Sequence, residues 1–201
     1  MKNKIAILAE EDVSRVVTVL CDAFYEYPVM RYVLKDSDNY DKELNLLIHF
    51  FTMARILRKE TIFGAFQKSE LIAVALTSNP SNSLKIPQLI ELRKQTWQKL
   101  GPGAKERYEK LGRIWMDLDK GVPNIHLNML AVMTNVQGSG AGRKLLEQVH
   151  KLSKKDPESQ GITLTTEDPE KVSFYEYMGY QQTGHAEVDE GLHTWNFFRA
   201  N

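Results

Sequence analysis

The sequence has little cysteine, no long apolar run and no excess of either charge. Cys21 is its one cysteine, so an internal disulfide is excluded. The longest apolar stretch, residues 71–76, is far shorter than the roughly 20 residues that cross a bilayer. The 26 basic residues balance the 26 acidic ones, so no overall positive field attracts nucleic acid or an anionic membrane. Because acidic residues 10–12 follow the start so closely, we expect no signal peptide, and hence a cytoplasmic protein without nucleic-acid or membrane partners.

The composition is that of a globular protein. Hydrophobic residues make up 42% of the 201 residues, and there is no internal repeat or low-complexity segment. A domain takes roughly 150 residues, so we expect a single domain over 1–201. A domain of this length buries about 70% of the surface of its unfolded chain, so its core needs no metal or disulfide for stability.

Hydrophobic periodicity predicts alternating strands and helices. An apolar segment near residues 5–8 leads into two or three amphipathic helices before residue 60. Two apolar segments around a polar link at 67–70 predict an antiparallel hairpin that closes at 79–83. The other predicted elements are a helix pair over 84–121 broken at 101–103, a central strand over 125–133 buried on both faces, a helix over 144–152, a strand over 162–166, a helix over 172–178 and a final strand over 194–198. This mixture predicts an α/β (α+β) fold.

A glycine-rich turn at 137–142 (QGSGAG) joins the predicted strand at 125–133 to the following helix. Backbone N–H groups in such a turn, at the positive end of a helix dipole, form a ready site for phosphate. The glycine spacing fits neither the dinucleotide fingerprint nor a P-loop. The turn therefore predicts a binding site for a phosphate-bearing ligand, but a site that belongs to neither of these two standard nucleotide motifs.

Residues 127–146 (LNMLAVMTNVQGSGAGRKLL) closely resemble the coenzyme A motif of the GNAT N-acetyltransferase superfamily. In that family the motif is an apolar strand ending in Val, a short turn, then Gln or Arg, two residues, Gly, one residue, and Gly or Ala. At these places stand Val132, Gln137, Gly140 and Gly142. Thr134 replaces the proline that the family usually carries two residues after the valine.

Residues 174–180 (FYEYMGY) resemble a second motif of the family, Phe-Tyr-Glu, two residues, Gly and an aromatic residue. Both motifs occur in the family's order and at its separation. Asp168 or Lys171 stands where the family often carries an asparagine that touches the cofactor. The resemblance implies a GNAT fold, with a central mixed, mostly antiparallel sheet flanked by helices, and with the helix pair near 84–121 as an insertion.

The resemblance also implies that acetyl-CoA is the acyl donor. Its pyrophosphate would lie on the N–H groups of the turn, where glycines allow an approach that a Cβ obstructs. Its pantetheine would run along the strand, with a backbone N–H near 130–131 polarising the thioester carbonyl. The motifs recognise the coenzyme rather than the acyl group, so succinyl- or propionyl-CoA stays an alternative donor. The implied cofactor-binding residues are Leu130, Ala131, Val132, Gln137, Gly138, Ser139, Gly140, Ala141, Gly142, Arg143 and Lys144.

Acetyl transfer to an amine needs a proton donor for the departing thiolate and an acceptor for the ammonium proton. Tyr175 is the predicted general acid, because the tyrosine of the second motif often has this role in the family. His126 is the predicted general base or relay. The stretch His126-Leu127-Asn128 keeps the first histidine of a His-Leu-His arrangement that removes protons in some members of the family. Glu167, at the end of the next strand, is a rival base.

The predicted function is direct transfer of an acetyl group, in a ternary complex, to a primary amine of a small molecule or peptide. Cys21 is remote in sequence from both motifs, which argues against a covalent relay. The alternative is a non-catalytic acyl-CoA-binding protein, favoured by the missing second histidine. The residues expected near the acceptor are Asp22, Tyr25, Glu26 and Tyr27, and Trp97, Tyr108 and Trp115 of the inserted helix pair are either core or pocket wall.

The sequence carries weaker signals for metal binding and for oligomeric state. His185 and His193 have no neighbouring cysteine and no close-set third ligand, so we expect no metal site. The final strand over 194–198 and the edges of the sheet offer surfaces for a homodimer.

Overall fold

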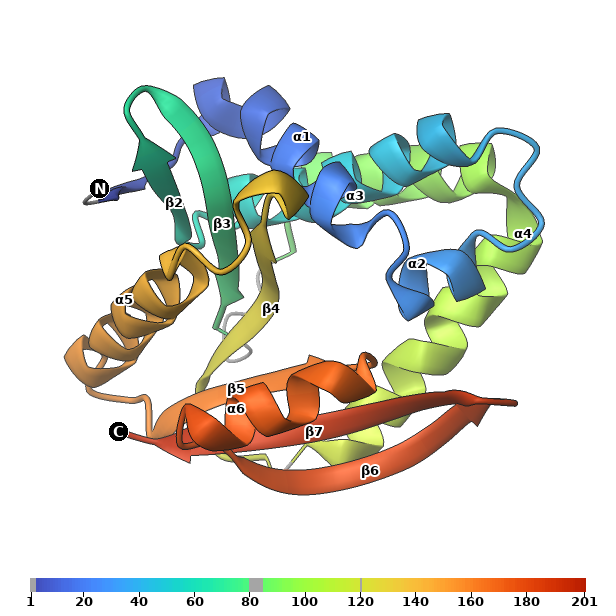
Figure 1. Cartoon of the computed structure of the whole chain (residues 1–201). Helices are drawn as coiled ribbons and strands as arrows, with labels where there is room; N and C mark the ends of the chain where they lie inside the picture. Colours follow the sequence, from blue (N-terminus) through green and yellow to red (C-terminus); the bar gives the residue numbers. More distant parts are fainter. Residues whose placement is uncertain (1–2, 80–84, 120) are drawn as a thin grey trace.

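The computed structural model describes residues 3–79, 85–119 and 121–201. Within these residues a seven-stranded sheet has the order β1-β2-β3-β4-β5-β7-β6 (Figure 1). Neighbouring strands are antiparallel except β4 and β5, which are parallel. The predicted mixed, mostly antiparallel sheet is therefore confirmed. The strands are β1 (Lys4–Ile7), β2 (Ile62–Gln67), β3 (Glu70–Ser78), β4 (Ile125–Val132), β5 (Gly161–Thr166), β6 (Gln181–Asp189) and β7 (Leu192–Ala200).

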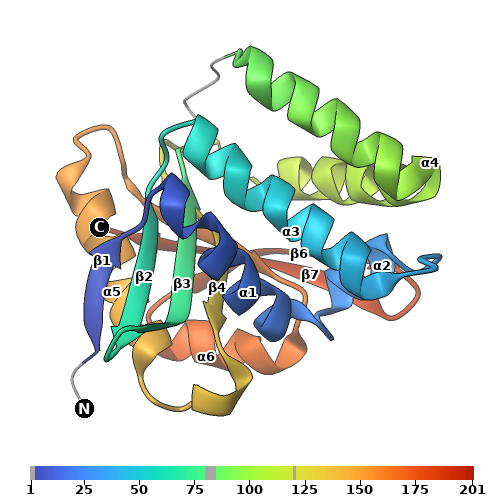
Figure 2. The ribbon, with the colours of Figure 1, turned by 90° about the horizontal axis from the view of Figure 1, so that it is seen from above.

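Helices cover both faces of the sheet (Figure 2). α1, α3 and α4 pack on one face, and α5 and α6 on the other, so each face has its own apolar cluster. Among the described helices, none combines the length and apolar character that a membrane crossing requires. The α-helices are α1 (Val13–Phe24), α2 (Pro28–Val33), α3 (Tyr40–Leu57), α4 (Pro87–Leu118), α5 (Ala141–Lys155) and α6 (Val172–Tyr177), and the 3₁₀ turns are η1 (Glu10–Asp12), η2 (Thr134–Val136) and η3 (Pro169–Lys171).

Helical spacing of apolar residues explains how α1 and α5 pack. In α1, Val16, Val17 and Leu20 fall on one side and are buried. In α5, Leu145 and Val149 are fully buried against the opposite face of the sheet. Each such side chain stabilises the fold by roughly 1.5–3 kcal/mol through burial. These two helices therefore hold β3 and β4 between them.

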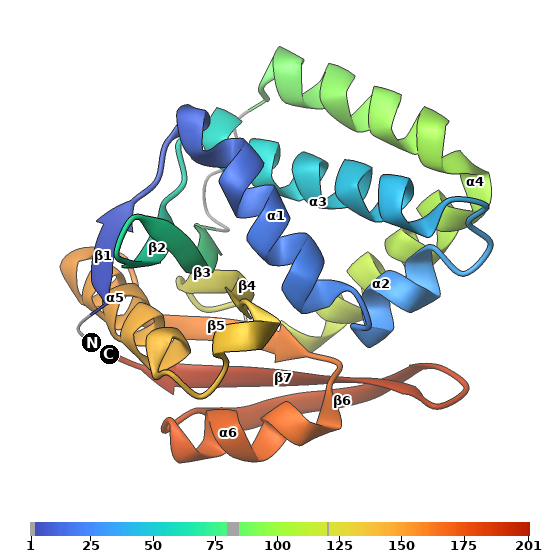
Figure 3. The same ribbon diagram turned by 45° about the horizontal axis from the view of Figure 1, so that its top comes forward.

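The predicted helix pair is present as the two arms of α4 (Figure 3). The arms meet at Gly101, whose φ of 84° and ψ of 167° lie outside the helical region. Pro102 follows, and because proline has no N–H it suits the start of the second arm. The predicted hairpin is also confirmed as β2 and β3, but its closing turn at 79–83 lies, apart from Asn79, outside the described residues.

Three features differ from the expectations. β4 is central but is not buried on both faces, because His126 is partly exposed and Asn128 exposed. The final strand, β7, lies between β5 and β6, so it offers no free edge for a dimer, and the sheet edges are β1 and β6. β6 was not predicted at all.

A β-bulge in β4 changes which side chains share a face. Leu76 of β3 pairs with Met129, and Thr77 pairs with Leu127, so Asn128 is the extra residue. Leu127 packs in the α5 cluster, whereas Met129 packs in the α1 cluster. The bulge thus moves the strand's buried side chains from one face of the sheet to the other.

Candidate active site

β4 and β5 pair over a short length and then part. Their paired residues are Ile125–Leu127 with Ile162–Leu164, whereas β4 continues to Val132 and β5 to Thr166. The widening gap between the two strands is visible in Figure 1. The backbone N–H and C=O groups of β4 beyond Leu127 that point away from β3 therefore face this gap and are available to a ligand.

A cleft of about 1180 Å³ lies at this gap. Its lining includes Tyr27 and Phe51, which pack with the α1 cluster, and Phe174 and Tyr175, which pack with the α5 cluster. The cleft thus reaches both faces of the sheet. Sites for one small ligand usually have about 300–1,000 Å³, so this cleft has room for two reactants that meet between the strands.

The glycine-rich turn borders one end of the cleft. Gly138 and Gly140 have φ of +80° and +76°, in the left-handed region that favours glycine, and a Cβ on either would meet nothing within 4 Å. Gly140 is also the N-cap residue of α5. Because glycine has no side chain to cap the helix, the first N–H groups of α5 remain for an anion.

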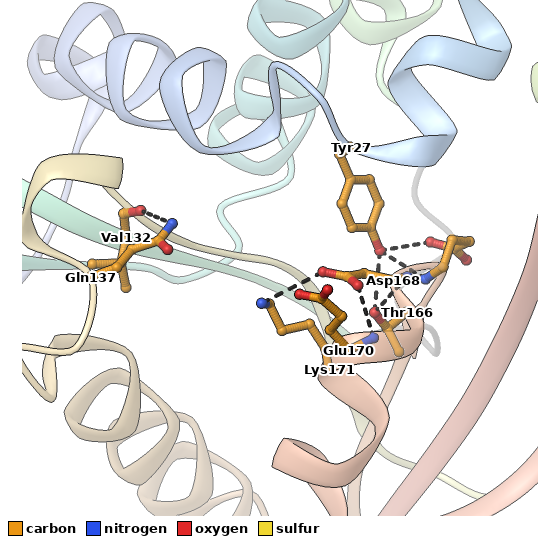
Figure 4. A network of polar contacts seen from close by, with 8 residues as sticks. Tyr27, Val132, Gln137, Thr166, Asp168, Glu170 and Lys171 are labelled. Atoms are coloured by element: carbon orange, nitrogen blue, oxygen red, sulfur yellow. Dashed lines mark hydrogen bonds and ion pairs between the residues drawn. The ribbon is translucent and has the colours of Figure 1, made fainter.

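The predicted cofactor residues line the cleft, except Ser139 and Ala141. Ala141 is buried, and the Ser139 N–H donates to the carbonyl oxygen of Val136 at 3.3 Å. The Gln137 side chain lies back on β4, where its Nε2 donates to the Val132 carbonyl oxygen at 3.4 Å (Figure 4). The end of β4 and the glycine-rich turn, which together make up the first motif, therefore line the same wall of the cleft.

At the opposite wall, η3 follows β5 (Figure 4). Asp168 is its N-cap residue and accepts a hydrogen bond from the Glu170 N–H at 2.9 Å. Lys171 pairs with the same carboxylate at 3.6 Å. The asparagine expected from the family is thus replaced by a charged pair that lines the cleft.

Tyr175 lines the cleft from α6. Its ring packs against those of Phe197 and Tyr180, with centroids 5.8 and 5.9 Å away. Burial raises the pKa of Tyr175, and the nearby Glu167 and Asp168 carboxylates raise it further. Tyr175 therefore keeps its proton at neutral pH, as a general acid must.

His126 lines the cleft from β4. Its Nδ1 lies 2.9 Å from the Thr163 hydroxyl oxygen. Burial, helped by the positive charge of Arg55, lowers the pKa of His126 to about 4, so the ring is neutral at physiological pH. Asn128, on the same side of the strand, accepts a hydrogen bond from Arg55 Nη1 at 2.8 Å.

Glu167, the rival base, is a buried carboxylate at the end of β5. It accepts hydrogen bonds from Tyr27 at 2.9 Å, from Trp115 Nε1 at 3.0 Å and from Thr194 at 2.6 Å. Burial raises its pKa, although these three bonds lower it. Protonation of Glu167 would weaken contacts that join β5 to α4, β7 and the start of α2. Glu167 also lines the cleft, so it stays the rival base.

The expected acceptor residues divide into two groups. Glu26, Tyr27, Tyr108 and Trp115 line the cleft, whereas Trp97 is buried against the ring of Phe50. The helix pair therefore supplies both core and pocket wall. Away from the lining, Tyr25 donates to Asp41 at 2.8 Å, and Asp22 accepts from the Thr134 N–H at 2.7 Å.

Other residues of the site were not predicted. Phe51 and Arg55 of α3 line the cleft, and Thr163 of β5 contacts His126. Phe51 and Arg55 belong to a helix far from the two motifs in sequence, and Thr163 belongs to the strand between the motifs but to neither of them. Their only sequence signal is a place in a predicted helix or strand, which does not show that the element packs beside β4.

Comparison with known proteins identifies the class of this fold and cleft. A model of the acetyltransferase (GNAT) domain matches residues 94–197, which is half of the chain. The chain belongs to the GNAT acetyltransferase family, as the two motifs predicted.

Solved structures share the whole fold. A Corynebacterium glutamicum protein described as histone acetyltransferase HPA2 and related acetyltransferase matches with a TM-score of 0.70 and 19% identity, over 100% of this chain and 97% of that one. A Drosophila melanogaster polyamine N-acetyltransferase matches with a TM-score of 0.69 and 14% identity, over 100% of both chains. At these identities the likeness shows the fold alone.

One curated sequence is also similar. A probable serine/threonine-protein kinase from Dictyostelium discoideum is 26% identical over a 199-residue alignment, and the match covers 90% of this chain and 21% of that protein. The chain therefore spans about a fifth of the length of the curated relative that it matches.

Proposed function

We propose that residues 1–201 form one cytoplasmic domain that transfers an acetyl group from acetyl-CoA to a primary amine of a small molecule or peptide. The observation that carries this proposal is the cleft between β4 and β5, with a glycine-rich turn at one end and aromatic walls at the other. The Drosophila relative catalyses the formation of N-acetylagmatine, which supports an amine as the acceptor.

The donor would occupy the side of α5 and α6. The N–H groups of the turn and of the first residues of α5 would hold the pyrophosphate, with Arg143 and Lys144 as nearby cations. The pantetheine would lie along the free side of β4, and its thioester carbonyl would accept a backbone N–H from residues 130–131. Leu130, Ala131 and Val132 line this part of the cleft.

The acceptor would enter from the face of the sheet that α1, α3 and α4 cover. Its nitrogen attacks the thioester carbon, the new C–N bond forms, and the C–S bond breaks. Tyr175 would protonate the departing thiolate, and His126 would take the proton from the nitrogen. Cys21 lies outside the cleft lining, and burial raises the pKa of its thiol to about 11, which supports direct transfer rather than a covalent relay.

A binding protein without turnover is the second candidate. The observation that favours it is Asn128, which stands where a second histidine would and is already engaged by Arg55. Retention of Tyr175 and His126 on the cleft favours the enzyme.

Calorimetric titration with acetyl-CoA and with free coenzyme A tests the donor site. The wild-type chain is expected to bind acetyl-CoA with micromolar affinity. Gly140→Trp should abolish this binding, because its side chain would fill the open space over the turn. Gly191→Trp is the matched control, since Gly191 also has a positive φ, +74°, and open space, but lies in the turn between β6 and β7.

If Gly140→Trp alone loses binding, release of free thiol should then be measured with alkylamines, arylalkylamines and polyamines. No binding of acetyl-CoA by the wild-type chain up to millimolar ligand would contradict the proposed function.

A further inference from the structure

His126 stands at one end of a chain of hydrogen bonds between β4 and β5. Asn124 Nδ2 donates to the Val122 carbonyl oxygen at 2.7 Å. The Thr163 hydroxyl donates to Asn124 Oδ1, also at 2.7 Å. The same hydroxyl oxygen lies 2.9 Å from His126 Nδ1, and His126 and Thr163 are directly paired across the two strands.

The direction of each bond in this chain follows from the one before it. The opposite orientation of the Asn124 amide would place its oxygen against the Val122 carbonyl oxygen, and two acceptors repel. With Asn124 Oδ1 facing Thr163, the single hydroxyl proton of Thr163 is used on Asn124. Towards His126 the hydroxyl oxygen is left as an acceptor, so Nδ1 carries the ring proton and Nε2 carries the lone pair.

Burial keeps water from replacing these partners. Asn124 is 4% exposed and Thr163 5%. The charged groups around His126 are Arg55 of α3, paired with Glu60 at 3.0 Å, and Asp119 after α4. Burial and the Arg55 charge hold the pKa of His126 near 4, so the neutral ring, with one protonated and one free nitrogen, is the form present at pH 7.

We propose that Asn124 and Thr163 are positioning residues that hold His126 as the Nδ1–H tautomer, so that its Nε2 is the atom that accepts the proton of the attacking amine. This inference rests on the proposed function. The proton passes from the amine nitrogen to Nε2, while Nδ1–H stays bonded to Thr163.

The imidazolium so formed is more acidic than an ordinary one, because burial and the Arg55 charge lower the pKa of His126 to about 4, and it therefore releases its proton more readily. His126 also lines a second, smaller cavity of about 210 Å³, together with Arg55 and Asn128. A histidine with its proton on Nε2 would face Thr163 with a lone pair and have no free nitrogen for the amine.

Nitrogen NMR of the chain labelled with ¹⁵N-histidine tests the tautomer directly. The five histidines are separated by comparison with a His126→Asn variant. The spectrum at pH 7 is expected to show His126 Nδ1 as the protonated nitrogen and Nε2 as the unprotonated one. A protonated Nε2 in the wild-type chain overturns the proposal, whether or not the chain acetylates any amine.

Thr163→Val and Thr163→Ser test the positioning role. Valine removes the acceptor oxygen at nearly constant shape, so His126 should lose its fixed tautomer and kcat should fall by about 10²-fold, with little change in acetyl-CoA affinity. Serine keeps the hydroxyl and should retain both the tautomer and most of kcat. The acidic limb of the pH–rate profile should also move in the valine variant and stay in place in the serine variant.

The proposal fails if Thr163→Val keeps the wild-type kcat and tautomer. Should that variant not fold, the wild-type spectrum decides alone. Failure of the proposed function is a different result, namely no transfer by the wild-type chain to any amine while His126 still shows the Nδ1–H tautomer.

Discussion

At the scale of single residues, Tyr175 and Tyr180 form a natural comparison. Their rings lie 5.9 Å apart, and burial raises the pKa of both. Tyr175 lines the cleft, whereas the hydroxyl of Tyr180 is 2.9 Å from His150 Nε2, away from it. If catalysis needs a proton donor beside the thiolate, the two hydroxyl groups should differ sharply in their effect on turnover.

Tyr175→Phe is expected to lower kcat by about 10²-fold and to leave acetyl-CoA affinity nearly unchanged, because the ring keeps its packing and only the proton donor is lost. Tyr180→Phe should cost about 1 kcal/mol of stability through its hydrogen bond and leave kcat intact. Steady-state kinetics, calorimetric titration and urea unfolding of both variants measure these effects. Equal losses of kcat in both variants would contradict the assignment of Tyr175.

At the scale of elements, Asp22 of α1 is hydrogen-bonded to the short η2 turn that precedes the proposed phosphate site. Its carboxylate accepts from the Thr134 N–H at 2.7 Å and from the Thr134 hydroxyl at 3.2 Å. A proline at 134, as the family usually has, has no N–H to make the first bond. The departure from the motif at Thr134 thus gives this chain a link between α1 and the segment that leads into the glycine-rich turn.

Thr134→Pro should fit the backbone, because residue 134 begins η2 and Met133 has the extended conformation, with ψ of 137°, that precedes proline. The variant should lose about 1 kcal/mol of stability, since the loss of a bond to a charged group exceeds the gain from a stiffer unfolded chain. In an Asp22→Ala background the same change should be neutral or stabilising. Urea unfolding of the two single variants and the double variant measures this coupling.

If Thr134→Pro costs the same in both backgrounds, the Asp22 contact does not stabilise the turn.

The same scale shows what the sequence could predict. The two motifs, the hairpin and the break at Gly101 each depend on local signals of glycine, proline and apolar spacing, and all appear in the structure. β6 was missed because it is an edge strand with exposed polar residues such as Gln181 and Glu187 and no run of apolar ones. The bulge at Asn128 was missed because it exists only in the register between β3 and β4.

The residues of the candidate site also divide into those that local sequence signals predict and those that only the packing of the fold brings together. Tyr175 and the turn at 137–142 lie in motifs, and so could be named from the sequence. Arg55 reaches the cleft only because α3 packs beside β4, and Thr163 contacts His126 only because β5 pairs with β4. No spacing within either segment shows these contacts.

At the scale of the whole molecule, two neutral histidines link stability to pH. Burial lowers the pKa of His126 and of His150 to about 4. His150 lies on α5, and its Nε2 is within 2.9 Å of the Tyr180 hydroxyl and 3.4 Å of Arg199 Nη1. The unfolded chain takes up a proton at each ring near pH 6.5, well before the native state does. The free energy of unfolding should therefore decrease progressively as the pH falls from about 6.5 to about 4.

His150→Gln isolates one of these two contributions. Glu60 and Glu167 have pKa values raised by burial, so they act in the opposite direction, and the total slope alone would mix both effects. The variant should be less stable than the wild type at pH 7, because its packing and hydrogen bonds are altered. This difference should shrink by about 1–2 kcal/mol between pH 6.5 and pH 4, because only the wild type loses stability when His150 is protonated in the unfolded chain. The value is reduced to allow for the half-buried position of His150. Urea unfolding of both proteins across this pH range measures the difference, and a constant gap would show that His150 binds protons equally in the native and unfolded states.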